Sequence, residues 1–241
     1  MKRLFTGLTD PGLVRTANQD AYFVDEEGRF FIVADGMGGH AGGQEASRIA
    51  TEVIQQYLHE YWDSPQVSTE LLKDAVLKAN HAIIQDQMTN PERSDMGTTV
   101  VVLMFRDEQP MCAHIGDSRL YRLRGAQLDQ ITDDHTWVAR AMKLGDITPT
   151  QARVHPWRHI LSKCLGREDL NQVEIQSFDY QPNDRLLLCS DGLTEELSDH
   201  VITTHMKTIR SCDKAAIALI DAAKDNGGRD NITVILVATE S

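Results

Sequence analysis

Five aspartates stand where an apolar run of the sequence meets a turn, and four of them have a glycine within three residues. They are Asp20, Asp35, Asp117, Asp191 and Asp230. A carboxylate at the end of a buried strand faces a partly dry site, where an unpaired charge is costly. Several such carboxylates would repel one another unless hard cations lay between them. The pattern therefore predicts an enzyme built around a cluster of Mg²⁺ or Mn²⁺ ions.

The residue types suit two divalent cations, because Mg²⁺ and Mn²⁺ prefer oxygen ligands. Asp35 with Gly36 offers a carboxylate and, beside it, a backbone carbonyl that no side chain covers. Asp191 and Asp230 could complete one cation, and Asp20 the other. With the cations roughly 3.5–4 Å apart, a bridging water would lose a proton near neutral pH and become a strong nucleophile.

Strands and helices must carry these aspartates to one place. Apolar runs rich in Val, Ile and Phe alternate with segments of helical period. We expect strands over residues 5–8, 21–24, 30–34, 98–105, 111–115, 120–124, 173–178, 185–190 and 232–238. We expect helices over residues 46–58, 71–83, 198–205 and 214–223. Most strands follow one another with no helix between them, which favours an α+β fold of antiparallel sheets with helices on the outer faces.

Two further segments carry predictions about organisation. Gly116–Asp117–Ser118 joins two apolar runs and is expected to form a hairpin turn. Residues 136–163 are rich in His, Arg and Trp and are interrupted by Gly and Pro, which is typical of a helical insertion or flap outside the sheets. The 241 residues contain no linker or repeat, so we expect a single domain over 1–241 and a monomer.

Composition narrows the range of partners. The formal net charge of -12 argues against nonspecific nucleic-acid binding and against an anionic membrane surface. No apolar run is long enough to cross a membrane. The four cysteines form no zinc or redox pair motif, which is typical of a reducing compartment. We therefore expect a cytoplasmic protein.

Six segments, taken together, resemble a known family. They are Arg15–Asp20, Asp35–His40, Gly97–Thr99, Gly116–Arg119, Ser190–Leu193 and Gly228–Asn231. In this order, and over nearly the whole chain, they resemble the metal-dependent protein serine/threonine phosphatases of type 2C in their compact bacterial form. The resemblance implies a four-layer α/β/β/α sandwich with a metal site at one end of the two sheets.

The resemblance also implies roles for single residues. The position of Asp35 bridges two core metals, Asp191 and Asp230 complete the first, and Asp20 with the Gly36 carbonyl serves the second. Asp117, with Asp191, is implied for a third metal.

Outside the metal set, Arg15 is implied to hold the substrate phosphate and His40 to act as general acid. The implied partner is a phosphorylated protein in signal transduction, with the nitrogen-signalling protein PII as one suggestion.

Simpler interpretations remain open at several positions. An isolated Asp-Gly is usually a turn, His40 could be a polar turn residue, and Arg15 could form an ordinary surface ion pair. The flap residues Arg153, His155, Arg158 and His159 could be solvated charge or could contact the substrate; we select Arg153 and His155 as substrate contacts. The protein could also be a metal-bound scaffold that docks a partner, or another metallohydrolase such as a nuclease.

Overall fold

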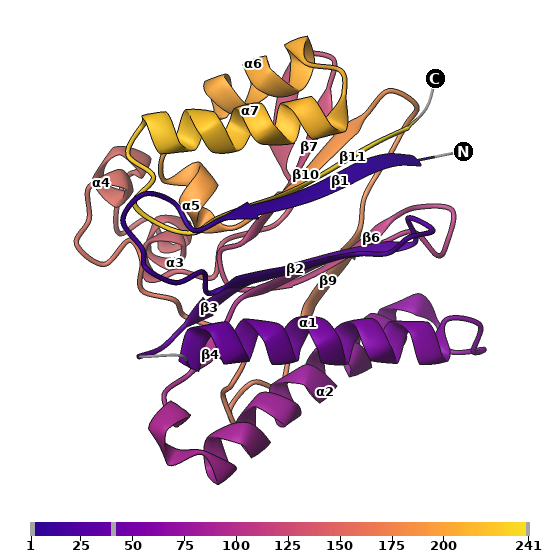
Figure 1. Ribbon diagram of the computed structural model, residues 1–241, viewed down its shortest axis with the longest axis vertical. Coiled ribbons are helices and arrows are strands. Elements are labelled where there is room, and N and C mark those ends of the chain that lie inside the picture. Colours follow the sequence, from indigo (N-terminus) through magenta and orange to yellow (C-terminus); the bar gives the residue numbers. More distant parts are fainter. Residues whose placement is uncertain (1–2, 40–41, 240–241) are drawn as a thin grey trace.

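Two antiparallel β-sheets face each other in the middle of the molecule, and helices cover their outer sides (Figure 1). The structure of the protein, a computed structural model, describes residues 3–39 and 42–239. The first sheet has the order β1 (Arg3–Asp10), β11 (Ile232–Thr239), β10 (Arg185–Cys189), β7 (Arg119–Arg124) and β8 (Gln127–Gln130). The second has the order β2 (Asp20–Val24), β3 (Phe30–Met37), β5 (Val100–Met104), β6 (Met111–Ile115) and β9 (Glu174–Ser177), with β4 (Gly97–Thr98) also paired to β3.

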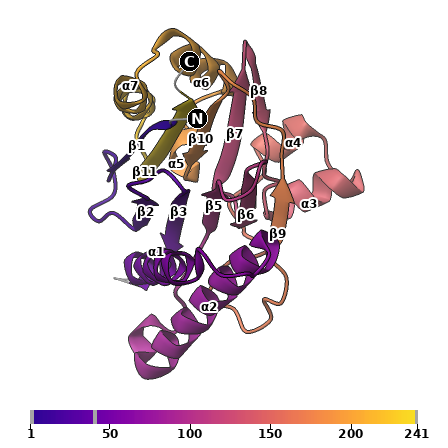
Figure 2. The same ribbon diagram turned by 90° about the vertical axis from the view of Figure 1, so that its right-hand side faces the viewer.

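The helices form the two outer layers, as Figure 2 shows from the side. The long helices α1 (Gly42–Tyr61) and α2 (Ser68–Thr89) cover the second sheet, while α6 (Asp199–Thr208) and α7 (Cys212–Asp225) cover the first. The short α5 (Asp191–Thr194) follows β10 directly, and a 3₁₀ turn, η1 (Pro91–Arg93), follows α2. The predicted α+β sandwich with four layers is therefore confirmed.

Strand β3 explains why the central strands are apolar without alternation. Phe30 and Ile32 pack toward α1 and α2, whereas Phe31 and Val33 pack between the two sheets. Successive side chains of a strand point to opposite faces, so a strand covered on both faces must be apolar at every position. The buried core consequently has three layers, one between the sheets and one under each pair of helices.

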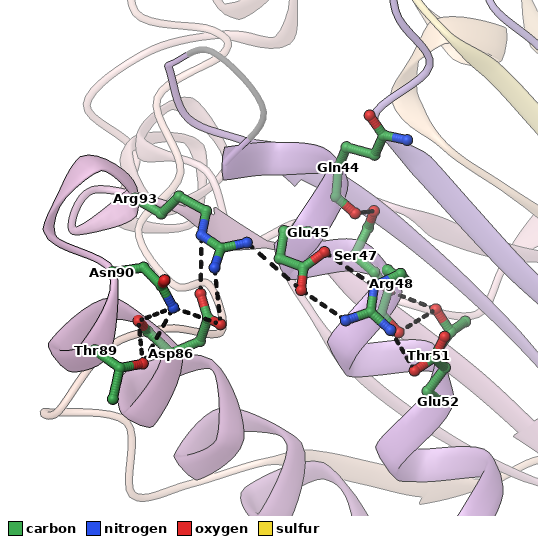
Figure 3. Close-up of polar contacts among 10 residues, drawn as sticks. All are labelled: Gln44, Glu45, Ser47, Arg48, Thr51, Glu52, Asp86, Thr89, Asn90 and Arg93. Atoms are coloured by element: carbon green, nitrogen blue, oxygen red, sulfur yellow. Dashed lines mark hydrogen bonds and ion pairs between the residues drawn. The ribbon is translucent and has the colours of Figure 1, made fainter.

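A charged network joins the start of α1 to the end of α2 (Figure 3). The Arg93 guanidinium lies 3.1 Å from Asp86 and 3.6 Å from Glu45, and Arg48 extends the chain of charges to Glu52. Guanidinium groups suit this role because their planar donors can serve two carboxylates at once. The network ties the segment after α2 to the first turn of α1, next to the glycine-rich end of β3.

The predicted hairpin at Gly116–Asp117–Ser118 is wrong. The segment does join two consecutive strands, but β6 belongs to the second sheet and β7 to the first. Gly116 has a φ of +104°, in the region that favours glycine, and there the chain turns from one sheet into the other. Asp117 therefore lies at a crossover between the sheets.

Smaller differences concern strand limits. The strand predicted over 98–105 is two strands, β4 and β5, separated at Thr99. Strand β8 (Gln127–Gln130) is absent from the sequence-based prediction because three of its four residues are polar, as its place at the edge of the first sheet allows. The predicted flap contains two short helices, α3 (Trp137–Leu144) and α4 (Pro149–Arg153), seen beside the sheets in Figure 1. No helix within residues 3–39 and 42–239 combines the length and apolar character that a membrane span requires.

Candidate active site

Polar residues end the apolar rows between the sheets, and they do so at one end of the sandwich. In β3, Phe31 and Val33 face the first sheet, and Asp35 is the next residue with the same parity. The same change from apolar to polar occurs in the neighbouring strands at Asp20, Thr99, Ser190 and Thr233. The strand period therefore brings these side chains together between the sheets.

Asp20 lies at the back of this polar group. Its Oδ2 accepts hydrogen bonds from Ser190 Oγ at 2.7 Å and Thr233 Oγ1 at 2.6 Å, so the residue links the two sheets. Burial raises the pKa of Asp20 to about 7, although these two hydrogen bonds favour the ionised form. The other carboxylate oxygen, Oδ1, is buried with no hydrogen-bond partner in the part of the chain that the structure describes.

The other four predicted aspartates line one cavity of about 590 Å³. They are Asp35, Asp117, Asp191 and Asp230, and Gly36 lies in the same wall. A Cβ at Gly36 would lie only 1.9 Å from the Gly43 carbonyl oxygen, so no larger residue fits there. The backbone at the end of β3 can therefore approach the cavity with no side chain in the way.

Two threonines hold the main chain of Asp35. Thr98 Oγ1 donates to the Asp35 carbonyl at 2.9 Å, and the Asp35 amide donates to Thr99 Oγ1 at 3.0 Å. Thr99 Oγ1 is also 2.7 Å from Ser118 Oγ, next to Asp117. These contacts place two of the aspartates in a shared frame, because β4 and the crossover are both bound to the end of β3.

The carboxylates of the cavity resist ionisation together. Burial raises the pKa of Asp35 well above its usual range, and the charges of Asp20, Asp191, Asp117 and Asp230 raise it further. Burial also raises the pKa of Asp117 to about 8, with Asp191 adding to the effect, and it raises the pKa of Asp191 beside Asp230. Like charges in a poorly solvated place favour the protonated form unless cations compensate them.

The residues fit a site for divalent cations. The donors are carboxylate oxygens and a backbone carbonyl, which is the ligand set that Mg²⁺ and Mn²⁺ prefer. The unpartnered Oδ1 of Asp20 and the raised pKa values of Asp35 and Asp117 both indicate negative charge that the chain itself does not neutralise. A bound cation would neutralise that negative charge.

Arg15 reaches the same cavity from the loop between β1 and β2. Its Nη2 donates to Asp230 Oδ2 at 2.7 Å, so the ion pair considered from the sequence is present, but its partner is one of the cavity aspartates. Asn231 holds this loop. Its Oδ1 accepts from the Gln19 amide at 2.7 Å, and its Nδ2 donates to the carbonyls of Pro11 and Ala17. The residue beside Asp230 thus fixes the segment that carries Arg15.

Several cavity residues were not selected as site residues from the sequence, although Arg158 and His159 were considered there as flap residues that could contact the substrate. Arg158 and His159 line the wall from the flap, and Glu195 lies 3.6 Å from the Arg158 guanidinium. Arg229 is paired with the buried carboxylate of Glu196 at 2.8 Å. The motif around Asp230 contains Arg229, but only the folded chain brings it opposite Glu196.

The remaining predicted residues are placed differently. The His155 ring stacks on Trp137 with centroids 4.8 Å apart, and its Nδ1 accepts the Trp157 amide, so it belongs to an aromatic cluster of the flap. Arg153 ends α4, and its side chain is outside the described part of the structure. His40 also lies outside the described residues.

The chain matches known proteins over most of its length. The family model described as protein phosphatase 2C matches residues 14–222. Protein phosphatase PhpP of Streptococcus pneumoniae is 38% identical over 240 residues, which cover 96% of this chain and 95% of that protein. Serine/threonine protein phosphatase PstP of Mycobacterium tuberculosis is 36% identical over 233 residues and 96% of this chain, but the match spans only 44% of PstP.

The similarity extends to three dimensions. A crystal structure of the catalytic domain of serine/threonine protein phosphatase PstP, in complex with two manganese ions, superimposes with a TM-score of 0.84 and 33% sequence identity. The match covers 98% of this chain and 97% of that one. The resemblance read from the six segments is thereby confirmed at the level of fold and family.

Proposed function

The chain belongs to the protein phosphatase 2C family, and from this premise we propose that it hydrolyses phosphoserine and phosphothreonine in proteins with Mg²⁺ or Mn²⁺ as cofactor. One observation supports this most strongly: four aspartates from separate segments line one cavity, with more negative charge than the chain neutralises. The manganese ions in the PstP catalytic domain agree with it.

We assign the cation ligands among the residues of the polar end. Asp35 would contact two core ions, Asp191 and Asp230 would hold the first, and Gly36 with Asp20 would serve the second. Asp117 would hold a third ion. The cavity wall contains Asp35, Asp191, Asp230 and Gly36. Asp20 lies behind this wall and can act through a water molecule.

When bound, the cations would neutralise charge on the phosphoryl group and lower the pKa of the water molecule that attacks phosphorus. Arg15 would bind the phosphoryl oxygens, because a planar guanidinium can donate two parallel hydrogen bonds. Its hydrogen bond to Asp230, an aspartate of the same cavity, supports this proposal. His40 would protonate the leaving serine or threonine oxygen, which is otherwise a poor leaving group.

The position of the cavity is suited to a protein substrate. It opens beside the flap, and Arg158 and His159 are the flap residues in its wall. We propose these two as contacts for the substrate chain, and we retain Arg153 and His155 as candidates that a substitution series would compare with them. Equal KM for all four alanine variants and the wild type would exclude the flap from substrate binding.

Metal dependence is the direct test. Purified protein treated with a chelator should lose hydrolysis of a phosphothreonine peptide, and added Mn²⁺ should restore it. Turnover that survives thorough metal removal would refute the assignment. A protein that binds Mn²⁺ and a phosphopeptide but never turns it over would be a docking scaffold, and faster cleavage of a nucleotide or DNA would indicate a different hydrolase.

The two roles outside the metal set are separable by kinetics. Arg15→Ala should mainly raise KM, because its phosphate contact exists in both the ground state and the transition state. His40→Ala should lower kcat on a phosphopeptide, and less so on an aryl phosphate with a good leaving group. An equal loss on both substrates would contradict the general-acid role.

Three narrower proposals concern the substrate, the assembly and the cellular role. The phosphorylated form of PII is one candidate substrate, and a comparison of rates on phospho-PII and unrelated phosphoproteins tests it. We propose a monomer with a single domain, which light scattering and limited proteolysis would check. We also propose a signalling role in the cytoplasm, consistent with the four free cysteines among the described residues.

A further inference from the structure

A second group of titratable side chains lies behind the loop that carries Asp117, apart from the cavity wall. His114 in β6 and His135 stack their imidazole rings, with centroids 4.7 Å apart and planes only 9° from parallel. Both are buried, with 1% and 7% of their surface exposed. Glu174 Oε1 lies 2.9 Å from His135 Nε2 and 3.0 Å from Lys163 Nζ.

The hydrogen bonds define which ring nitrogens carry protons. The Gly116 amide donates to His135 Nδ1 at 3.0 Å, so this nitrogen must present a lone pair. The proton of the neutral ring is then on Nε2, which faces Glu174. His114 Nε2 lies 2.9 Å from the Asp133 carbonyl oxygen, which can only accept, so this nitrogen also carries a proton.

These tautomers argue against a cation among the three side chains. His114, His135 and Glu174 each offer a ligand-type atom, all within 4.8 Å of one another. A metal-bound histidine must present a lone pair to the ion. Both Nε2 atoms that face Glu174 carry protons, so the group is better suited to orienting the main chain than to binding a metal.

His135 forms two hydrogen bonds with Gly116, one through its main chain and one through its ring. Its own amide donates to the Gly116 carbonyl at 2.9 Å, while its ring accepts the Gly116 amide. Gly116 is the residue with positive φ at the crossover, and a Cβ there would lie 2.6 Å from Thr99 Cβ. Glycine is forced at this position, and because glycine has the widest conformational freedom, an external contact must define its conformation.

We propose that His135 is a positioning residue: its ring holds the Gly116 peptide, and thereby directs the next residue, Asp117, toward the cavity. Glu174 lies against the ring at Nε2, and Lys163 in turn contacts Glu174. Since Lys163 is the last residue of the flap segment, the contact also links the flap to the crossover. The inference rests on the proposed function for the ligand role of Asp117, but not for the contact itself.

Burial, together with the neighbouring His114, lowers the pKa of His135, which agrees with a neutral ring at neutral pH. Residues that orient a ligand typically change metal affinity by about 10- to 100-fold when they are replaced. We therefore expect a loss of this size in the Mn²⁺ site that depends on Asp117 when the ring acceptor is removed.

The first test uses the wild-type protein without metal. Long-range ¹H–¹⁵N NMR of the imidazoles should show His135 with an unprotonated Nδ1 and a protonated Nε2. The Gly116 amide should exchange slowly with solvent. A protonated Nδ1, or a Gly116 amide that exchanges as fast as an exposed loop, would overturn the proposal, whatever the enzyme hydrolyses.

The second test compares variants by Mn²⁺ titration with electron paramagnetic resonance. His135→Leu removes the acceptor, whereas the side-chain oxygen of His135→Asn can still accept from Gly116. We expect weaker binding at the Asp117-dependent site in His135→Leu and recovery in His135→Asn, with both thermal midpoints recorded. His205→Leu, in α6, is the control and should bind Mn²⁺ like the wild type.

Asp117→Ala distinguishes the positioning role of His135 from the ligand role of Asp117. If Asp117→Ala weakens one Mn²⁺ site and His135→Leu does not, the positioning role is refuted while the ligand assignment stands. If neither variant changes Mn²⁺ binding but His135→Leu speeds exchange of the Gly116 amide, the contact is supported and the ligand role of Asp117 in the proposed function fails.

Discussion

Two buried carboxylates lie at opposite ends of strand β2, and their surroundings differ completely. Asp20, at the start of the strand, accepts hydrogen bonds from two hydroxyl groups, and burial raises its pKa to about 7. Asp25, just after the end of the strand, is bound by the Arg29 guanidinium through contacts of 3.0 and 2.8 Å and by His59 Nε2 at 2.9 Å. Burial opposes ionisation of Asp25 as well, but these partners outweigh it and lower its pKa to about 2.

The comparison separates an acid whose charge the chain neutralises from acids whose charge it does not neutralise. At Asp25 the chain supplies its own positive charge, so the site is complete and locks the β2–β3 turn to α1. At the other end of the sheets, Asp20 joins Asp35, Asp117 and Asp191, whose pKa values are all raised. Such clusters are typical of functional sites, which agrees with the cation site proposed above.

The largest effect on turnover should come from removing one carboxylate charge at the end of the sheets where Asp35 lies. Asp35→Asn should reduce phosphopeptide turnover by about a thousandfold or more, because several kcal/mol of charge stabilisation is lost with the cations. Steady-state kinetics with saturating Mn²⁺ would measure it. Asp25→Asn is the matched control and should retain turnover per folded molecule; if Asp35→Asn stays within tenfold of it, the two ends are functionally equivalent.

For stability we expect the reverse order, with a larger loss for Asp25→Asn than for Asp35→Asn. Asp25→Asn should lower the free energy of unfolding by about 3 kcal/mol, since it leaves the buried end of the Arg29 guanidinium without its partner. In the metal-free protein, Asp35→Asn should leave stability unchanged or increase it, because it relieves repulsion among carboxylates. Urea denaturation of both variants in chelator would test this. A larger loss for Asp35→Asn would invert the comparison.

Mn²⁺ should raise the free energy of unfolding by binding at the end of the sheets that holds Asp35, and not at the end that holds Asp25. At a free Mn²⁺ concentration of 100 times Kd, one site adds about 2.7 kcal/mol to the free energy of unfolding. We expect Mn²⁺ to raise the thermal midpoint of the wild type and of Asp25→Asn, and to raise that of Asp35→Asn much less. Equal shifts in all three proteins would mean that Mn²⁺ binds elsewhere.

The pH dependence of stability should reveal the Asp25 end. Its folded pKa of about 2 lies below an ordinary value near ~3.9, so the unfolded chain binds the proton more readily. The contribution, roughly 2 kcal/mol, is therefore complete above about pH 4 and is lost as the pH falls toward 2. Denaturant midpoints from pH 2 to 6 should converge for the wild type and Asp25→Asn at the acid end; parallel curves would contradict the assignment.

The half-exposed Arg48–Glu52 pair of the network in Figure 3 marks the lower limit of such effects on stability. Glu52 is half exposed and pairs with Arg48 along α1. Glu52→Ala should cost about 0.5 kcal/mol or less, as exposed helix pairs do, and 1 M NaCl should remove the difference. A loss comparable to that of Asp25→Asn would show that burial is not the deciding variable.

Local patterns account for what could be predicted. The aspartates were placed at strand ends because apolar runs and turn residues are local signals. The covered part of a central strand, such as Phe30–Ala34 of β3, is apolar at every position up to the aspartate. The hairpin expected around Asp117 failed because two adjacent apolar runs say nothing about which strands they pair with. That choice depends on β10, which pairs with β7, and on β9, which pairs with β6, and both are distant in sequence.

The sequence by itself determined the class of fold, the family and the set of acidic residues, because periodicity and residue type act over short stretches. Only the tertiary structure decided that Asp20 lies behind the cavity, that Arg158 and His159 rather than His155 reach its wall, and that His135 grips Gly116. Each of these depends on the alignment of one sheet against the other, and on long-range contacts that no local pattern encodes.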